Sequence, residues 1–480
     1  MRKYLIVILF FLFVLSLFTE MYTFLSIAVT IVVFYSLIDK IGKGITLLET
    51  MAIYSCIIYL IMPLLGYAVY TKDSRITVIW AKQMPVPYAT YYSFILPAIC
   101  AYLLGLFLLN YTTGRSDEGE KLQVHITRIK SKLALSPNTG IILIIIGILF
   151  YFIKAMVPGP LSAIASFGYL LIFPGLFYVH FQPKLKKKGW IYILVTIFFV
   201  RDALDTGMFT VFFYMGITIV SFFLLGKKIR FPIKLATIVA AISCLFVLQL
   251  VKGTFRRSTW KKSYTGSKAE LFQNLFIEKA GGFDEIFSEN TFFPIYVRFN
   301  QGLVTSMVMK RIPAKQPYDG GESIAKTLAA SVVPRILWPD KPQSGGVYNM
   351  QHFAGFKLKG WSTNIGPVGE AYGSFGVGGG IVYMFFFGLF IGWAYTRVFS
   401  LSRSKPLLLL WIPLLFFEVM YSMENDTLQA VNSLVKAAVF MWILYKLFPA
   451  LFKGGNKTDN TKNENRDHLR DNRPGWSLSG

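Results

Sequence analysis

Continuous apolar runs of roughly 20 residues recur along this chain, and they limit its fold more than any other feature. A helix of that length crosses about 30 Å of hydrocarbon. Runs of this kind are unlike the short alternating segments of an outer-membrane barrel. Hydrophobic residues make up 54% of the 480 residues and charged residues only 15%, which excludes a soluble globular fold. We therefore predict an all-α polytopic membrane protein.

About twelve membrane-spanning helices are predicted, and the first is expected to be retained because no small-residue cleavage site follows it. The predicted spans cover residues 4–19, 22–38, 45–69, 88–109, 139–157, 161–181, 190–200, 208–225, 235–251, 376–395, 407–423 and 428–448. These spans divide the chain into four predicted regions. The regions are spans one to nine (1–251), one long polar segment (252–375), spans ten to twelve (376–448) and a disordered tail (449–480).

Basic residues occupy every second loop, as expected for loops on the cytoplasmic side of a membrane. The basic loops are 39–43, 115–132, 184–188, 227–230 and 397–405. This alternation predicts that both termini are cytoplasmic and that residues 252–375 lie on the outer face. Segments 71–87, 201–206 and 424–427 are expected on the same face. We attribute the net charge of +24 to loops that meet anionic lipid headgroups, and not to nucleic-acid binding.

The long outer segment is itself basic, with sixteen Lys and Arg against nine Asp and Glu, a net charge of +7. One interpretation is that these cations reach lipid phosphates. The other is that Arg256, Arg298 and Arg335, which have aromatic or apolar neighbours, hold an anionic ligand. A guanidinium can bind two phosphate oxygens at once, which favours the second interpretation for these three residues.

Apolar residues near helical spacing predict amphipathic helices within residues 271–287, 292–309 and 323–337. These helices would lie on the outer leaflet and roof a cavity, or form a small cap with no role in lipid access. The prolines of residues 334–342 stiffen the chain, so Arg335, Trp338 and Lys341 should hold fixed relative positions. Trp338 is then either a sugar-stacking platform or an anchor at the membrane interface.

Gly369, Gly373, Gly376 and Gly380 are predicted to share one helix face. Such a face permits close helix packing, or close approach of a ligand to the backbone. Glu370 stands near the start of this helix, where a carboxylate is favoured by the helix dipole or could act as a base. No nucleotide-binding, zinc-binding or Ser-His-Asp motif is evident, so the sequence indicates neither a cofactor nor a metal.

The layout and three local features resemble one known family. These features are the segments 334–342 and 366–376 and Arg201 at the end of a span. They resemble the O-antigen and exopolysaccharide repeat-unit polymerases (Wzy-type), which are related in architecture to the O-antigen ligases. The resemblance implies a C-type glycosyltransferase-like fold in the bacterial cytoplasmic (inner) membrane. The implied activity is metal-independent polymerisation of undecaprenyl-pyrophosphate-linked oligosaccharides for a cell-envelope polysaccharide such as a capsule, with a flippase and a chain-length regulator as expected partners.

The resemblance also implies roles for particular residues. Arg298 and Arg335 would bind the pyrophosphate, supported by Arg256, Arg201, Lys341 and Trp338, and Glu370 or His352 would be the base. Three other functions remain open at this stage: an O-antigen-ligase-like transferase, a flippase or other transporter of lipid-linked oligosaccharide, and a non-catalytic assembly factor. Transporters usually have two comparable halves and short outer loops, unlike the late long segment here.

Overall fold

The computed structural model of the chain is helical throughout the part that it describes. All regular elements of that part are helices, which confirms the predicted all-α class. The described residues are 2–70, 75–112, 119–154, 156, 165–209, 215–260, 264–281, 289–333, 337–340, 346–358 and 363–454.

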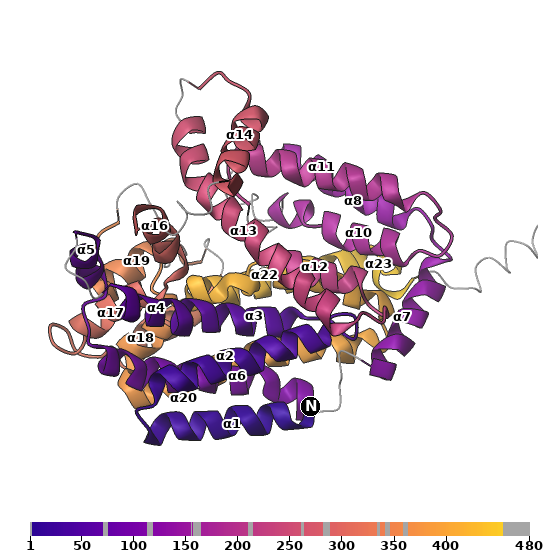
Figure 1. Cartoon of the computed structure of the whole chain (residues 1–480). Coiled ribbons are helices and arrows are strands. Elements are labelled where there is room, and N and C mark those ends of the chain that lie inside the picture. The colour runs from indigo at the N-terminus through magenta and orange to yellow at the C-terminus, as the bar shows by residue number, and fades with distance from the viewer. Residues whose placement is uncertain are drawn as a thin grey trace, which may run out of the picture. The chain divides into compact units, whose positions relative to one another are not determined.

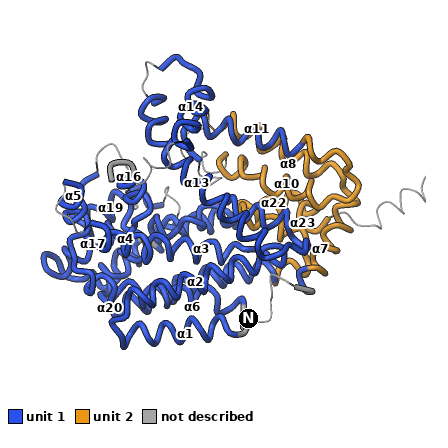
Figure 2. The backbone as a smooth tube through the Cα atoms, in the orientation of Figure 1, with its two compact units in different colours: residues 1–122, 191–399, 415–438 blue, residues 123–190, 400–414, 439–480 orange. Residues whose placement is uncertain are grey.

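The chain forms two compact units, shown in different colours in Figure 2. Unit 1 contains residues 1–122, 191–399 and 415–438, and unit 2 contains residues 123–190, 400–414 and 439–480. Unit 1 is built from α1 (Arg2–Phe18), α2 (Tyr22–Lys40), α3 (Leu47–Cys56), η1 (Ile57–Ile61), α4 (Met62–Val69), α5 (Arg75–Gln83), α6 (Tyr88–Thr112), α12 (Gly216–Phe223), α13 (Phe231–Thr259), α14 (Lys268–Gly281), α16 (Glu289–Phe299), α17 (Gly302–Arg311), α18 (Glu322–Val332), α19 (Val347–Asn349), η3 (Met350–Ala354) and η5 (Val419–Glu424). Unit 2 is built from α8 (Thr139–Ile153), α10 (Ile172–Phe181), η4 (Pro406–Trp411) and α23 (Ala450–Lys453). The chain passes between the units in α7 (Gly119–Leu133), α11 (Lys188–Thr206), α20 (Gly366–Ser402), α21 (Ile412–Phe416) and α22 (Thr427–Leu447).

Seven helical segments among the described residues are long and apolar enough to cross a membrane. They are Tyr22–Lys40, Leu47–Val69, Tyr88–Asn110, Phe231–Thr259, Gly366–Ser402, Pro406–Glu424 and Thr427–Leu447. This confirms a membrane protein with several apolar helices. The other predicted spans coincide with shorter helices such as α1, α8 and α10, so the total of twelve stays a prediction.

Helix α6 is the central helix of unit 1 and is mostly buried. It packs against α1 and α2, and α20 approaches it so closely that their backbones nearly touch. A Cβ atom at Gly105 of α6 would lie 2.1 Å from the carbonyl oxygen of Phe385, and one at Gly388 of α20 would lie 2.2 Å from that of Tyr102. Only glycine permits this approach, and small residues have the same role in many membrane helix pairs.

Two of the segments predicted to share the outer face, 71–87 and the long segment that begins at residue 252, meet at one end of unit 1. Helices α5, α16, α17, α18 and α19 gather there (Figure 1). Trp80 of α5 donates a hydrogen bond to the Tyr296 hydroxyl of α16 (2.7 Å), and the Ser306 hydroxyl of α17 lies 3.2 Å from the Gln83 carbonyl. These contacts join segment 71–87 to the long segment that begins at residue 252.

Helix α13 runs past Val251, the predicted end of its span, as far as Thr259. Its buried Val251 and Phe255 pack against apolar residues of α14, among them Leu271 and Leu275. The predicted apolar pattern of residues 271–287 is therefore present in α14, where it faces another helix of the protein. Residues 282–287 of that pattern lie outside the described part of the chain.

The glycine face predicted for the helix after residue 366 is interrupted. Gly376 has φ 68° and ψ −158°, which breaks the helical path inside α20, so the four glycines do not lie on one continuous face. A Cβ at Gly373 would lie 2.4 Å from the Phe353 ring, and one at Gly380 would lie 2.8 Å from the Phe94 ring. The Tyr318 ring takes the corresponding place at Gly376. These glycines thus make room for aromatic side chains, which agrees with the packing interpretation.

Candidate functional site

The candidate site lies where α16 meets η5 and α3 within unit 1. Arg298, in the last turn of α16, forms an ion pair of 2.8 Å between its Nη2 and Oε2 of Glu424. Glu424 is the last residue of η5, and its other carboxylate oxygen accepts a hydrogen bond from the Tyr54 hydroxyl of α3. The Arg298 side chain keeps 40% of its surface exposed while Glu424 keeps 10%. Glu424 therefore fixes one edge of the Arg298 guanidinium, and the side chain remains accessible to solvent.

A second guanidinium approaches the first from α13. Arg256 donates a hydrogen bond from Nε to the Gly207 carbonyl (2.7 Å), and its guanidinium lies 4.7 Å from the centre of the Trp260 ring. Helices α13 and α16, which carry Arg256 and Arg298, are in contact. The structure thus brings together two of the three arginines that the sequence singled out for an anionic ligand.

Glu370 is a residue of α20, and its side chain is buried beside the first residue of α22. Its side chain is 2% exposed and accepts hydrogen bonds from Asn349 Nδ2 (2.6 Å), the Thr427 backbone N–H (2.9 Å) and the Thr427 hydroxyl. A helix N-terminus has unpaired N–H groups, and Glu370 supplies an acceptor for one of them. This carboxylate therefore joins α20, α22 and the short α19.

Asp426 reinforces the same junction as the residue before α22. It accepts hydrogen bonds from the Gln429 backbone N–H (2.6 Å) and from Asn364 Nδ2 (2.8 Å), the first of which is the usual pattern of an N-cap. Gln301 Nε2 in turn donates to the Asn364 carbonyl (2.6 Å). These hydrogen bonds connect the start of α22, through Asn364, to Gln301, which lies between α16 and α17.

His352 lies on η3 and points to Asp319, whose Oδ2 is 3.6 Å from its Nε2. The imidazole stacks on the Tyr348 ring with 5.4 Å between centres and 9° between planes. Its side chain is 31% exposed. Because Asn349 of the preceding turn is bonded to Glu370, His352 is tied to the same network while keeping access to solvent.

Asp319 is held by several donors around its carboxylate. Burial opposes its ionisation, yet the pKa of Asp319 lies well below its ordinary value because His352, the Ser323 and Gly321 backbone groups and Ser374 stabilise the charged form. The hydrogen bonds from the Gly321 and Ser323 N–H groups measure 2.9 and 3.3 Å. Asp319 therefore remains ionised at neutral pH and can orient His352.

Replacing Asp319 with asparagine is expected to lower stability at neutral pH. The folded-state pKa is depressed, so the carboxylate contributes its full stabilisation above its unfolded pKa of about 3.9 and loses it progressively as pH falls from there through the lower folded-state pKa. The thermal midpoints of the two proteins in detergent should therefore differ from pH 5 to pH 8 and converge toward pH 3. A difference that stayed constant down to pH 3 would contradict the role of the ionised carboxylate.

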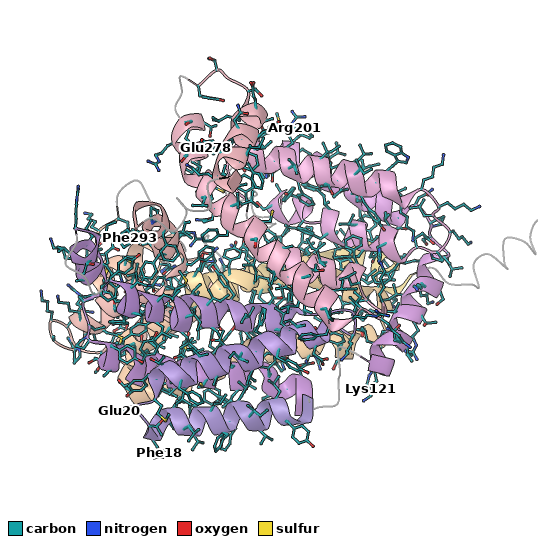
Figure 3. All side chains as sticks on the ribbon, in the orientation of Figure 1. Phe18, Glu20, Lys121, Arg201, Glu278 and Phe293 are labelled. Carbon is teal, nitrogen blue, oxygen red and sulfur yellow. The ribbon has the colours of Figure 1, made fainter. Side chains whose placement is uncertain are left out.

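Other predicted residues lie apart from this network or outside the described residues. Arg201 is 77% exposed, faces Asp205 at 3.6 Å and lines a shallow groove of about 400 Å³ with Lys268. Figure 3 shows Arg201 at the end of α11, well away from Phe293 on α16, the helix that carries Arg298. Trp338 is partly exposed, and Arg335 and Lys341 lie outside the described residues.

The network lies among helices that depart from regular α geometry. Besides the break at Gly376, η1 is a π-helical turn inside the third apolar segment. Carbonyls of this turn accept hydrogen bonds from neighbours: that of Ile58 from the Gln301 N–H (3.1 Å) and that of Tyr59 from the Tyr91 hydroxyl (3.0 Å). Such π turns are frequent at functional sites because they open backbone groups to other partners.

Several residues of the network were not identified from the sequence as a set. Glu424 and Asp426 fall in segment 424–427, which the sequence predicts only to lie on the outer face, and the sequence indicates no role for Tyr54, Asn349 or Asp319. Glu424 and Asp426 share one sequence signal, a polar Glu-Asn-Asp group between two apolar runs. The others stand in or beside segments whose composition gives no sign of their partners.

Nearly the whole chain matches one family model. Residues 7–450 match the family described as "Domain of unknown function (DUF8712)", and the chain belongs to this family. No curated protein matches the chain, and no solved structure does.

Proposed function

We propose that this protein is a polysaccharide polymerase of the cytoplasmic membrane that joins lipid-pyrophosphate-linked oligosaccharide repeat units on its outer face. The observation that carries the proposal is the placement of Arg256 and Arg298 on the contacting helices α13 and α16, within the segment predicted to lie on the outer face. Cations held in a half-buried site suit a pyrophosphate leaving group, whose developing charge they can stabilise.

The proposed reaction is a single displacement. The acceptor hydroxyl oxygen forms a bond to the anomeric carbon of the donor sugar, and the bond from that carbon to the pyrophosphate oxygen breaks. The pyrophosphate leaves with the electron pair and is stabilised by Arg298 and Arg256. The hydroxyl proton passes to His352, which Asp319 orients, because His352 is accessible whereas Glu370 is enclosed and fully hydrogen-bonded. Glu370 is then a positioning residue.

The proposed orientation, with both termini in the cytoplasm, is supported by the charge of unit 2. Its residues 123–190 and 400–414 contain no Asp or Glu, whereas their loops carry Lys184, Lys186, Lys187, Lys188 and Arg403. Such a one-sided charge is typical of cytoplasmic loops. The remaining parts of this proposal, twelve spans and a C-type glycosyltransferase-like fold, rest on the sequence.

A ligase-like transferase would use the same groups with another acceptor. The transporter alternative has one specific observation in its favour, since broken helices beside buried carboxylates are common in transporter binding sites. The two classes differ in their product. A transporter moves the lipid-linked unit and leaves its length unchanged, and a polymerase lengthens the glycan.

Purified protein reconstituted in vesicles with lipid-linked repeat units is expected to produce a ladder of longer glycans with EDTA present and no nucleotide added. Replacing His352 with alanine should reduce the rate of elongation at least about 100-fold, the usual effect of losing a general base. Gel analysis of the released glycans measures both. Translocation of the unit across the vesicle membrane without elongation would support the transporter, and transfer of one finished chain to a different acceptor would support the ligase.

A further inference from the structure

Three lysines of unit 2 gather around the last turn of α22. The ammonium nitrogen of Lys405, the residue before η4, lies 3.9 Å from the centre of the Tyr445 ring, and that of Lys453 in α23 lies 5.6 Å from the same centre. Lys446, which follows Tyr445 in α22, has its ammonium nitrogen 5.9 Å from the centre of the Trp442 ring. These three residues, the lysine cluster, come from three different helices.

Aromatic packing fixes the short helix α23, which supplies one of the lysines. Phe452 is buried and stacks on Trp411 of η4 with 4.5 Å between ring centres, and it meets the Tyr445 ring edge to face at 5.9 Å. The Tyr178 hydroxyl donates a hydrogen bond to the Leu451 carbonyl and accepts one of 3.0 Å from Trp411 Nε1. The folded interior of unit 2 therefore holds the lysine cluster in place.

The described residues of unit 2 contain neither Asp nor Glu, so that part of the unit offers the lysine cluster no carboxylate partner. Lys446 and Lys453 are exposed and Lys405 is partly exposed. An aromatic ring attracts a cation through its electron-rich face but leaves the positive charge in place. Like charges gathered in this way repel one another, and an anion bound among them offsets the repulsion. The lysine cluster thus favours an anionic ligand.

The surface beside the lysine cluster is apolar and continues along α22. Val439, Ile443 and Leu447 follow one another at i, i+4 spacing, so they share one side of the helix, and all three are exposed. Trp442 and Phe448 are exposed as well. Helix α22 is long and apolar enough to cross a membrane, and an exposed apolar row on such a helix suits contact with hydrocarbon. The lysines at the end of that row then match the level of the lipid headgroups.

Cations at headgroup level beside an apolar row fit a phospholipid whose headgroup has a net negative charge. Its phosphate oxygens accept hydrogen bonds from ammonium groups, and its acyl chains follow the exposed row of α22. A zwitterionic headgroup carries a cation of its own, and a free phosphate makes no use of the apolar row. We propose that Lys405, Lys446 and Lys453 form a binding site for an anionic phospholipid, which stabilises the packing of α22, η4 and α23. In the proposed orientation, this site opens to the cytoplasmic leaflet.

Titration of the full-length protein in neutral detergent tests the proposal with three probes: dioctanoyl phosphatidylglycerol, dioctanoyl phosphatidylethanolamine and glycerol phosphate. Calorimetry gives the affinities, and thermal unfolding gives the stabilisation. Phosphatidylglycerol should bind at least about 10-fold more tightly than either other probe and raise the thermal midpoint. Combining Lys405→Ala, Lys446→Ala and Lys453→Ala should weaken its binding about 100-fold, because each lysine near an anionic headgroup contributes to the attraction. Arginine at the same three positions keeps the charge and should retain binding.

The matched control combines Lys184→Ala, Lys186→Ala and Lys187→Ala, which removes the same charge from an exposed part of unit 2 and should leave the affinity unchanged. Equal weakening by the two triple variants, or a folded cluster variant that binds as well as the unaltered protein, would overturn the site. Equal affinity for glycerol phosphate would overturn the assignment to a lipid, and equal affinity for phosphatidylethanolamine would overturn the role of net charge. Each outcome is independent of glycan elongation, so it is distinct from a failure of the proposed function.

Discussion

Replacing Arg298 with alanine is expected to reduce glycan elongation at least about 100-fold, because the departing pyrophosphate loses a preorganised donor. The loss should appear in the maximal rate as well as in substrate affinity, since the charge on the leaving group grows as the bond breaks. Initial rates of ladder formation at several donor concentrations separate these two effects. The variant should remain folded, because the Arg298 side chain is substantially exposed.

Two further variants make this expectation specific. Arg298→Lys keeps the charge but not the planar fork, and we expect it to recover only part of the rate. Lys326→Ala removes an exposed cation that pairs with Glu322 four residues away on α18, and it should leave the rate unchanged. Elongation by Arg298→Ala at the rate of the unaltered protein would remove Arg298 from the reaction.

Replacing Glu370 with alanine is expected to destabilise the protein by about 3 kcal/mol, enough to reduce the folded fraction recovered from the membrane. The substitution leaves the Asn349 amide and the Thr427 N–H and hydroxyl without their shared acceptor in a buried place. It also removes the acceptor for the first backbone N–H of α22. Thermal unfolding in detergent, followed by size-exclusion chromatography, measures the change against Glu322→Ala, an exposed carboxylate.

Glu370→Gln then distinguishes the two candidate bases. Glutamine keeps one acceptor oxygen in nearly the same place, so folding should largely survive. If Glu370 is a positioning residue, elongation should fall by less than about tenfold. A folded Glu370→Gln protein that has lost elongation about 100-fold or more would instead make Glu370 the base and remove His352 from that role.

The helices of this protein could be predicted from the sequence because long apolar runs have few alternatives in a membrane. The two interruptions of these helices, at Gly376 and at Ile57–Ile61, could not be predicted from the sequence. Gly376 was counted as part of a helical glycine face, since glycine is equally compatible with a helix and with the positive φ that it adopts here. The π turn at Ile57–Ile61 leaves no mark in composition, because its extra carbonyl contacts come from Gln301, Tyr91 and Tyr92, which are distant in the chain.

In the site, too, the residue types could be predicted from the sequence, whereas their proximity could not. Arginines in an outer segment are recognisable by type and neighbours, so Arg256 and Arg298 could be singled out. Their proximity depends on how α13 packs against α16, which no spacing rule predicts. Lys252 looked like the start of a loop and is instead part of a continuous helix. Asp319 and His352 are 33 positions apart, and only the fold reveals that they face each other.

The break in α20 also bears on how deep in a membrane Glu370 would lie. The helix has 37 residues, about 55 Å at 1.5 Å per residue, which exceeds the roughly 30 Å of hydrocarbon in a bilayer. The residues after Gly376 alone extend about 39 Å and suffice to cross it. In the proposed orientation, the ten residues before Gly376, Glu370 among them, would lie at the level of the lipid headgroups. For the proposed reaction, a lipid-linked diphosphate would reach that level with its prenyl chain still in the bilayer while the sugar changes carrier.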